Sequence, residues 1–302
     1  MSKEKKIFVF LLLICFSTKI YSQFVHSRYY YYYDQPFVFE IGAGIGAMNC
    51  ITDIGGANGD KTFYLNEMRL KNFRPAPSIY ASAMYHNFIG ARLEGTFGQI
   101  RSADTDIQPQ TNNSNSRKIR NLSFRSNIAE VSLLLEFHPF LVFSYEEKNW
   151  LVEPYLTAGL GWFTFNPQTL YNGTWVDLRP LHTEGEGFPE YPNVSNYHLS
   201  QVNVPVGIGV RYNVSSRINV RLEYMHRILA TDYLEDVSSN KFINPSAFDK
   251  NLSPVLAADA KALYNRSKQP AVSPRRGNPD NNDTYMSLSL KVGIILGREF
   301  RP

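Results

Sequence analysis

The sequence predicts an all-β protein, an up-and-down antiparallel transmembrane β-barrel of about eight strands with long extracellular loops. Three observations favour this fold class. Segments along the chain alternate apolar and polar residues, and the connections between them alternate between long and short. After residue 22, no apolar run approaches the roughly 18 to 20 residues of a membrane-spanning helix. Since lipid offers no hydrogen bonds to the backbone, strands that span a membrane must close into a barrel.

The alternation is clearest in the last segment, Thr284–Leu296. Apolar residues from Met286 to Leu296 fall on one face, while the other face is polar or glycine except for Ile295. A soluble β-sandwich shows similar alternation, but the recurrence of the same phase in the earlier segments favours a barrel in lipid. The expected strands are Phe37–Ala47, Pro77–His86, Ile89–Ile100, Phe124–His138, Leu151–Phe165, Val202–Asn213, Ile218–Arg227 and Thr284–Leu296.

The connections supply an independent signal because their lengths alternate. The long ones are Met48–Ala76, Arg101–Ser123, Asn166–Gln201 and Ile228–Asp283, and the short ones lie around Asn87, at Pro139–Trp150 and at Val214–Arg217. Bacterial barrels keep short turns in the periplasm and long loops outside, so we expect both chain termini in the periplasm. The long loops are polar and show no sustained helical period. A strand at Phe140–Tyr145, or a hairpin inside a long loop, would raise the strand number.

Residues 1–22 have the pattern of a secretory signal peptide. Lysines precede an apolar stretch, Ile7–Phe16, and cleavage is expected after Ser22. The mature chain would then consist of a periplasmic, Tyr-rich N-terminal segment, residues 23–36, followed by one outer-membrane barrel domain, residues 37–302. These features predict a protein of the cell outer membrane.

Charge and cysteine content exclude other classes of protein. Cys15 is lost with the signal peptide, and the bulky Ile14 before it disfavours a lipoprotein site, so Cys50 remains alone and no intramolecular disulfide is possible. The signal takes four Lys and one Glu from totals of 31 and 27, which leaves 27 basic and 26 acidic residues, a net charge of +1. Such a balance argues against nucleic acid as a partner.

The alternation also places charged side chains of both signs on the inward face of the barrel. These lumen residues are Glu40, Arg92, Glu94, Glu130, Glu136, Glu153, Arg211, Arg221, Glu223, Arg227 and Lys291. Buried charges are tolerated when they are paired, and the interior of an eight-stranded barrel is about wide enough for side chains to fill. We therefore expect a salt-bridged plug, with a proton or solute path along the charges as the alternative.

Residues capable of catalysis are present without a diagnostic spacing. His182, His198 and His226 can be combined with Asp232 or Glu235, as in small barrel enzymes that pair such groups with a carboxylate near the outer rim, but no nucleophile elbow accompanies them. We expect no enzymatic activity.

Metal and nucleotide sites are equally unsupported. The acidic residues of segments 231–238 and 278–283 do not match the spacing of a calcium loop, and we expect no metal and no cofactor. The Gly-x-Gly-x-Gly run in segment 37–47 lacks the strand-turn-helix context of a dinucleotide site. We interpret these glycines as space for neighbouring side chains inside a narrow barrel.

Five short sequence segments are more specific to a protein family than the alternation is. They are Thr52–Gly56, Ser123–Glu130, Pro154–Pro167, Arg221–Ile228 and Thr231–Ser238. In order and spacing over residues 37–297, the chain resembles the PorG-like outer-membrane β-barrel family of the type IX secretion system.

This resemblance implies an integral outer-membrane protein that works with the periplasmic ring proteins of that machine, in protein export and, in some bacteria, gliding motility. It implies no catalytic residues. The expected partners are outer-membrane lipid and lipopolysaccharide, together with those ring proteins. A structural outer-membrane barrel outside secretion and a small lipid-modifying barrel enzyme are the alternatives.

Overall fold

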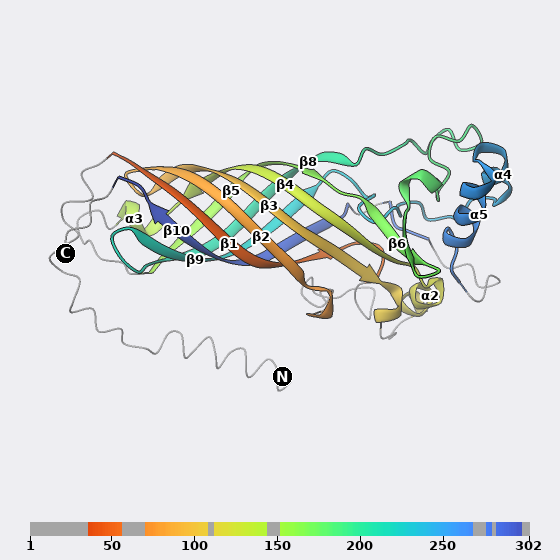
Figure 1. Cartoon of the computed structure of the whole chain (residues 1–302), viewed down its shortest axis with the longest axis horizontal. Helices are drawn as coiled ribbons and strands as arrows, with labels where there is room; N and C mark the ends of the chain where they lie inside the picture. The colour runs from red at the N-terminus through yellow and green to blue at the C-terminus, as the bar shows by residue number, and fades with distance from the viewer. Residues whose placement is uncertain are drawn as a thin grey trace. The chain divides into compact units, whose positions relative to one another are not determined.

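The computed structural model describes residues 36–55, 70–107, 112–143, 152–267, 276–279 and 282–297. Ten strands form one sheet, in which eight close an antiparallel barrel (Figure 1). The barrel strands are β1 (Phe37–Ile51), β2 (Arg74–Tyr85), β3 (Ile89–Ala103), β4 (Ser123–Phe137), β5 (Val152–Thr164), β8 (Ser200–Asn213), β9 (Ile218–Leu229) and β10 (Thr284–Ile295). The expected signal peptide, residues 1–22, and residues 23–35 of the Tyr-rich segment lie outside the described residues.

Closure follows from the order of the strands. The sheet runs β3-β2-β1-β10-β9-β8-β5-β4, and pairing of β3 with β4 joins its two edges. The terminal strands meet in register with Gly44 opposite Lys291, and β3 meets β4 with Thr96 opposite Glu130. Each strand therefore has a partner on both sides, and the predicted fold class is confirmed.

Several strands extend beyond the predicted ends at the side of the long loops. β1 continues to Ile51 rather than Ala47, and β3 continues to Ala103, which pairs with Ser123. The outward-facing apolar residues stop before the strands end, whereas the backbone hydrogen bonds between strands continue beyond them. The pattern in the sequence therefore marks the apolar belt and not the full ladder.

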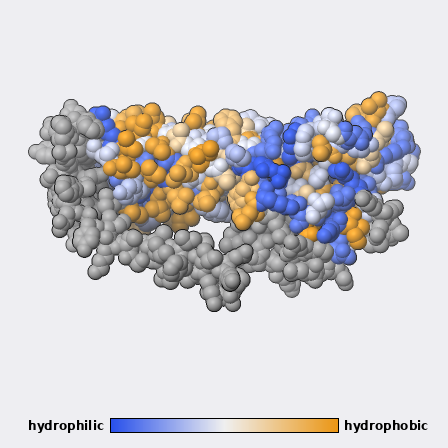
Figure 2. All heavy atoms as spheres, turned by 60° about the horizontal axis from the view of Figure 1, so that its bottom comes forward, coloured by the Kyte–Doolittle hydropathy of each residue, from blue (hydrophilic) through white to orange (hydrophobic). Residues whose placement is uncertain are grey.

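The exterior of the barrel is apolar on every strand. Figure 2 shows apolar residues over the barrel and hydrophilic residues gathered toward one end. Exposed side chains of this belt include Phe39, Ile45, Ile79, Leu93, Leu133, Leu160, Ile208, Leu222 and Leu290. Soluble monomers rarely expose apolar patches beyond a few hundred Å², so an apolar surface that encircles a barrel is suited to lipid.

Two residues of β10 keep their predicted faces but are exceptions on them, Ile295 as an apolar residue of the inward face and Met286 as a buried residue of the outward face. Ile295 points inward and packs with Val38 and Met84 in a small apolar cluster. Met286, predicted on the lipid face, is buried, and the hydroxyl of Tyr224 lies 3.7 Å from its sulfur. This residue lies at the end of the belt, where the long connections begin to cover the strands.

The long connections contain short helices that the sequence pattern did not predict. They are the α-helices α2 (Asn112–Arg120), α4 (Ser246–Asn251) and α5 (Pro254–Leu263), and the 3-10 turns η2 (Leu70–Asn72), η3 (Asp104–Asp106) and η4 (Arg179–Leu181). Each is too short to display a readable helical period. In the described part of the chain, no helix has both the length and the apolar character to cross a membrane.

Two of the ten strands lie in a long connection and not in the barrel wall. β6 (Pro167–Tyr171) and β7 (Thr174–Asp177) form a hairpin in the third long connection, and β6 pairs with β4 outside the ring of eight. The first residues of the short connection after β4 form the helix α3 (Pro139–Phe143), so the described part of the alternative strand at Phe140–Tyr145 is helical. Figure 1 shows α3 at one end of the barrel and α2, α4 and α5 at the other.

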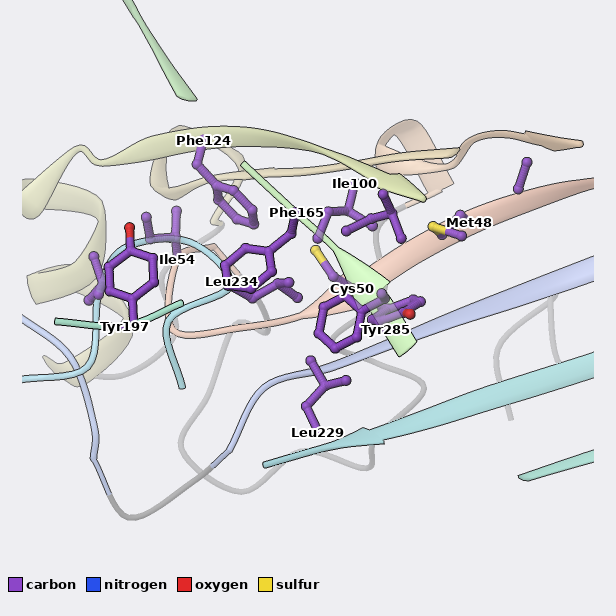
Figure 3. Packing of buried hydrophobic residues seen from close by; sticks show 14 of the residues in the cluster. Met48, Cys50, Ile54, Ile100, Phe124, Phe165, Tyr197, Leu229, Leu234 and Tyr285 are labelled. Atoms are coloured by element: carbon purple, nitrogen blue, oxygen red, sulfur yellow. The ribbon is translucent and has the colours of Figure 1, made fainter. Parts of the chain in front are cut away.

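The described parts of the four long connections, which we call the cap, pack together over that end of the barrel. One apolar cluster joins strand residues such as Met48 and Phe124 to Ile54 and Leu234 of the connections (Figure 3). A second apolar cluster contains Leu178, Leu181, Phe188, Ile243, Phe248, Ala257, Ala260 and Leu263. The cap therefore has packed cores of its own.

The apolar belt predicts a cost for charge that depends on depth. Leu290 lies at the middle of β10 and Leu296 just after its end, and their exposed fractions are similar, 52% and 45%. Arginine at a bilayer midplane costs about 2 to 4 kcal/mol and near the interface about 0 to 1 kcal/mol. We expect Leu290→Arg to lower the free energy of unfolding in lipid vesicles by the larger amount and Leu296→Arg by the smaller. Equal losses in urea titrations would contradict a membrane-embedded belt.

Candidate functional site

The interior of the barrel is lined by charged and polar side chains from every strand. All the charged residues assigned to the lumen are buried: Glu40 of β1, Arg92 and Glu94 of β3, Glu130 and Glu136 of β4, Glu153 of β5, Arg211 of β8, Arg221, Glu223 and Arg227 of β9, and Lys291 of β10. β2 contributes Tyr80, which is also buried. We call this set the lumen network.

Glu136 is the centre of the lumen network. Its Oε1 lies 2.6 Å from Nη1 of Arg221, and its Oε2 lies 3.1 Å from Nη1 of Arg92. All three side chains are fully buried. One carboxylate thus joins guanidinium groups from β3 and β9, strands that are not neighbours in the sheet.

Two carboxylates flank Lys291. Its Nζ lies 2.5 Å from Oε1 of Glu94 and 2.6 Å from Oε1 of Glu223. Arg92 contacts the same two carboxylates, with Nη2 2.5 Å from Glu223 and Nε 3.2 Å from Glu94. Positive and negative groups therefore alternate through the middle of the barrel, which offsets the desolvation of each.

Two tyrosine rings enclose the paired arginines. The Arg221 guanidinium lies 5.3 Å from the ring centroid of Tyr80 and 5.5 Å from that of Tyr155. The Tyr80 hydroxyl donates to Glu40 at 2.5 Å, and the Tyr155 hydroxyl donates to Glu223 at 2.8 Å. A Cβ at Gly42 would overlap the Tyr80 ring, so this member of the glycine run leaves room for an aromatic side chain.

The network continues toward the short turns at one end of the barrel. Arg211 donates from Nε to Glu153 at 2.7 Å. His138 lies between two carboxylates, 2.8 Å from Glu136 and 3.7 Å from Glu153. The imidazole therefore connects this ion pair to the central carboxylate.

The network also continues toward the cap. Arg227 pairs with Glu130 at 3.0 Å and donates to the Ser287 hydroxyl at 2.6 Å. Its guanidinium lies 5.3 Å from the ring centroid of Tyr285, which belongs to the first apolar cluster of the cap. The polar lumen and the apolar core of the cap thus meet at this arginine.

Neutral side chains complete the lumen network, and the sequence analysis did not single them out. Asn219 donates to Oε2 of Glu40 at 2.9 Å, and Asn203 donates to Oε1 of Glu130 at 3.2 Å. Both occupy inward positions of the same alternation. A search of those positions for amides and hydroxyls as well as charges would have found them.

A separate group of buried charges holds the cap together. Arg120 of α2 donates to both carboxylate oxygens of Asp104, at 2.9 and 2.8 Å, and to the backbone oxygen of Asp53 at 2.7 Å. Asp104 also accepts the backbone N–H groups of Gly55 and Leu122, each at 2.9 Å. One ion pair therefore joins the first two long connections.

A second arginine joins the remaining connections. Arg276 donates from Nε to Glu184 at 2.8 Å, and from Nη2 to the Thr183 hydroxyl. Glu184 accepts the backbone N–H of Ser239 at 2.8 Å. Both cap arginines are buried, so the cap depends on them as the lumen depends on its own pairs.

Other acidic groups of the cap have raised pKa values. Desolvation raises the pKa of Asp232 to about 7, with the nearby Asp53 and Glu184 charges adding to the rise. Burial also raises the pKa of Asp53 to about 6 and that of Asp236 to about 6. The Asp53 N–H donates to Glu235 at 2.6 Å, so two of the strings used in the sequence analysis meet here.

The histidines considered for catalysis lie on different elements. His182 follows η4, and its Nδ1 lies 2.7 Å from the backbone oxygen of Glu186. His226 occupies the outward face of β9, between Val206 and Met286. Among the described residues, no group of three or more His, Cys, Asp or Glu side chains is arranged to hold a metal ion.

Comparison with known proteins identifies a family by sequence. The model of DUF6089, a domain of unknown function, matches residues 5–179, which is more than half of the chain. A search of curated proteins found no match.

Solved structures with a similar arrangement are outer-membrane or surface proteins at low identity. Neisserial surface protein A is 12% identical over 86% of this chain and 97% of its own, with a TM-score of 0.36. Ail of Yersinia pestis is 10% identical over 87% and 100%, with a TM-score of 0.37. A major outer membrane protein of Thermus thermophilus is 13% identical over 87% and 100%, with a TM-score of 0.38. The strand pairing and apolar exterior of this chain are the architecture of an integral outer-membrane barrel.

The lumen network predicts that loss of its central carboxylate is costly. Glu136→Gln keeps the side-chain shape but leaves Arg92 and Arg221 each short of a counter-charge, and breaking a buried pair costs about 3 to 5 kcal/mol. The matched control is Asp249→Asn, which removes the exposed pair with Lys261 and should cost about 0 to 1 kcal/mol. Urea unfolding in detergent or lipid measures both. A loss below about 1 kcal/mol for Glu136→Gln would contradict a stabilising role of the network.

The cap predicts a stability that falls as pH rises. Because the folded pKa of Asp232 is raised to about 7, the folded cap binds more protons than the unfolded chain between about pH 4 and 7, and stability is lost across that range. We expect amide hydrogen exchange in segment 231–238, corrected for intrinsic rates, to show less protection above this range than below it. Asp232→Asn should reduce the dependence, most strongly near pH 7, because the raised pKa values of Asp53 and Asp236, about 6, maintain part of it. An unchanged pH profile in this variant would assign the effect to other groups.

Proposed function

The chain belongs to the DUF6089 family, and we propose that it is an integral outer-membrane barrel that serves as a non-catalytic component of the type IX protein secretion machinery. In this role it associates with the periplasmic ring proteins of that machine and, in gliding bacteria, contributes to motility. Its short turns and both chain termini face the periplasm, and the cap faces outward. We expect any conductance to be small and poorly selective, and we expect no cofactor.

The observation that carries the structural part of the proposal is the filled lumen with nearly balanced charges. A pore needs a wide interior or a surplus of one sign of charge, whereas here Glu136, Glu223 and their partners pair across the barrel. The rings of Tyr80 and Tyr155 lie next to the guanidinium groups of Arg92 and Arg221. Such an interior is suited to a rigid membrane anchor and not to transport through the barrel.

The resemblance of the sequence supports the secretion part. Arg221–Ile228 supplies cations of the lumen network, and the residues of Thr231–Ser238 pack in the cap against Asp53 and Arg276. The strings that resemble the PorG-like family thus contribute to both polar networks of the structure. They make the barrel rigid and capped, which suits a membrane component that holds a fixed position on a ring.

Two alternatives use the same fold differently. A structural outer-membrane barrel outside secretion needs only the apolar belt and the plugged lumen. A small lipid-modifying barrel enzyme needs an assembled acid or nucleophile at the outer rim, and the separate positions of His182 and His226 disfavour it.

A gene deletion distinguishes the three roles. We expect deletion to leave type IX cargo proteins in the periplasm, and tagged protein to co-purify with the periplasmic ring complex, with secretion restored by the wild-type chain. Altered lipid A mass with intact secretion would indicate the enzyme instead. Intact secretion and unchanged lipid A would indicate a structural barrel and contradict the secretion role.

A further inference from the structure

The outward face of β3 and β4 changes character toward the cap. In the antiparallel register, Phe97 lies opposite Ala129 within the apolar belt. The next outward pair is Gln99 with Asn127, joined by a 2.8 Å hydrogen bond, and the pair after that is Arg101 with Arg125. The surface thus passes from apolar to polar to cationic within two steps of the alternation.

The two arginines are direct cross-strand neighbours, and two like charges in such a pair repel each other. Arg101 donates from Nη2 to the backbone oxygen of Lys71 at 2.9 Å, and Arg125 donates from Nε to the side-chain oxygen of Gln168 at 3.0 Å. Within the part of the chain that the structure describes, neither makes an ion pair with a carboxylate, whereas each lumen arginine does. This rim therefore has cationic groups with hydrogen-bonding capacity to spare.

A hollow of about 200 Å³ lies beside the arginine pair, and its wall includes Lys71, Arg101 and Trp175 together with one carboxylate, Asp106. The Arg125 guanidinium stacks on Trp175 at 3.7 Å from the ring centroid, which fixes its orientation. The Nζ of Lys71 lies 2.5 Å from Asp106, but its side chain is 57% exposed and open to another anion. Indole rings at this level are typical of the boundary between lipid and water.

A second, open hollow of about 410 Å³ lies along the same strands, toward the apolar belt. Phe97, Ala129 and Phe165 contribute to its wall, together with the polar Asn127 and Asn166. A ligand that occupies both hollows must be anionic at the rim and apolar below it.

We propose that this face binds the phosphorylated headgroup of an outer-leaflet glycolipid of the lipid A type. Arg101 and Arg125 donate to a phosphate, since the guanidinium fork matches phosphate geometry. Lys71, which is paired with Asp106 but exposed, offers a further N–H donor. The acyl chains lie over Phe97 and Ala129. The inference rests on the proposed outer-membrane location, and the apolar hollow below the arginines favours a lipid over free phosphate.

The test measures lipid binding by the full-length chain folded in a phosphatidylcholine bilayer disc. The probe is bis-phosphorylated lipid A, compared with the same lipid after phosphatase treatment, and native mass spectrometry reports the bound fraction. The variants are Arg101→Gln, Arg125→Gln and the double substitution. Arg217→Gln, in the turn between β8 and β9 at the opposite end of the barrel, is the matched control. Heat-modifiable migration in gels verifies that each variant is folded.

We expect each rim substitution to weaken binding of phosphorylated lipid A about tenfold, the double substitution about a hundredfold, and the control not at all. Dephosphorylated lipid A should bind the wild-type protein as weakly as the phosphorylated lipid binds the double variant. Equal affinity of the folded double variant and the wild type would overturn the site. So would displacement of the lipid by inorganic phosphate at the same concentration.

The outcome also separates this inference from the proposed function. A wild-type chain that does not insert into bilayers would overturn the outer-membrane role and the lipid site together. Insertion without dependence on Arg101 and Arg125 would overturn the lipid site alone, because the belt and the lumen network do not involve these residues.

Discussion

The structure depends on the pairing of buried charges across the lumen. Glu136 joins Arg92 and Arg221, which come from non-adjacent strands and meet across the lumen of the closed barrel. Closure removes these groups from water, and their pairing offsets that desolvation cost, so the closed barrel requires the pairs. The lumen network also specifies register, because a shift of one residue in β4 would move Glu136 from the lumen to the lipid face.

The remaining features follow from this constraint. A lumen filled by long charged side chains and by the rings of Tyr80 and Tyr155 needs positions without a Cβ, and Gly42 and Gly209 lie beneath those rings. The polar interior leaves the apolar residues to the exterior, where they form the belt. At one end, the same pairing of buried arginines with carboxylates recurs in Arg120 and Arg276, so the cap is bound together by chain segments distant in sequence.

Inside and outside differ in how their arginines are satisfied. In the lumen network, and at Arg120 and Arg276 of the cap, each arginine is paired with a carboxylate, so its charge is balanced within the protein. On the outer rim, Arg101 and Arg125 are held by neutral oxygen atoms and an aromatic ring, so their charge remains available to an external anion. A rigid anchor with a lipid-facing cationic rim is compatible with a role as a fixed membrane component of a larger machine.

The sequence by itself determined the strands, their faces and the alternation of long and short connections, because the period of two is a local property of a strand whose faces meet different surroundings. It therefore also assigned residues such as Glu136 and Lys291 to the interior. Only the tertiary structure decided which charges pair, since Glu136 and Arg221 are 85 residues apart and meet through closure and register. The short helices and the ion pairs of the cap were likewise decided there, because α2 and α4 are too short for a readable period and Asp53, Arg120 and Arg276 meet only through tertiary packing.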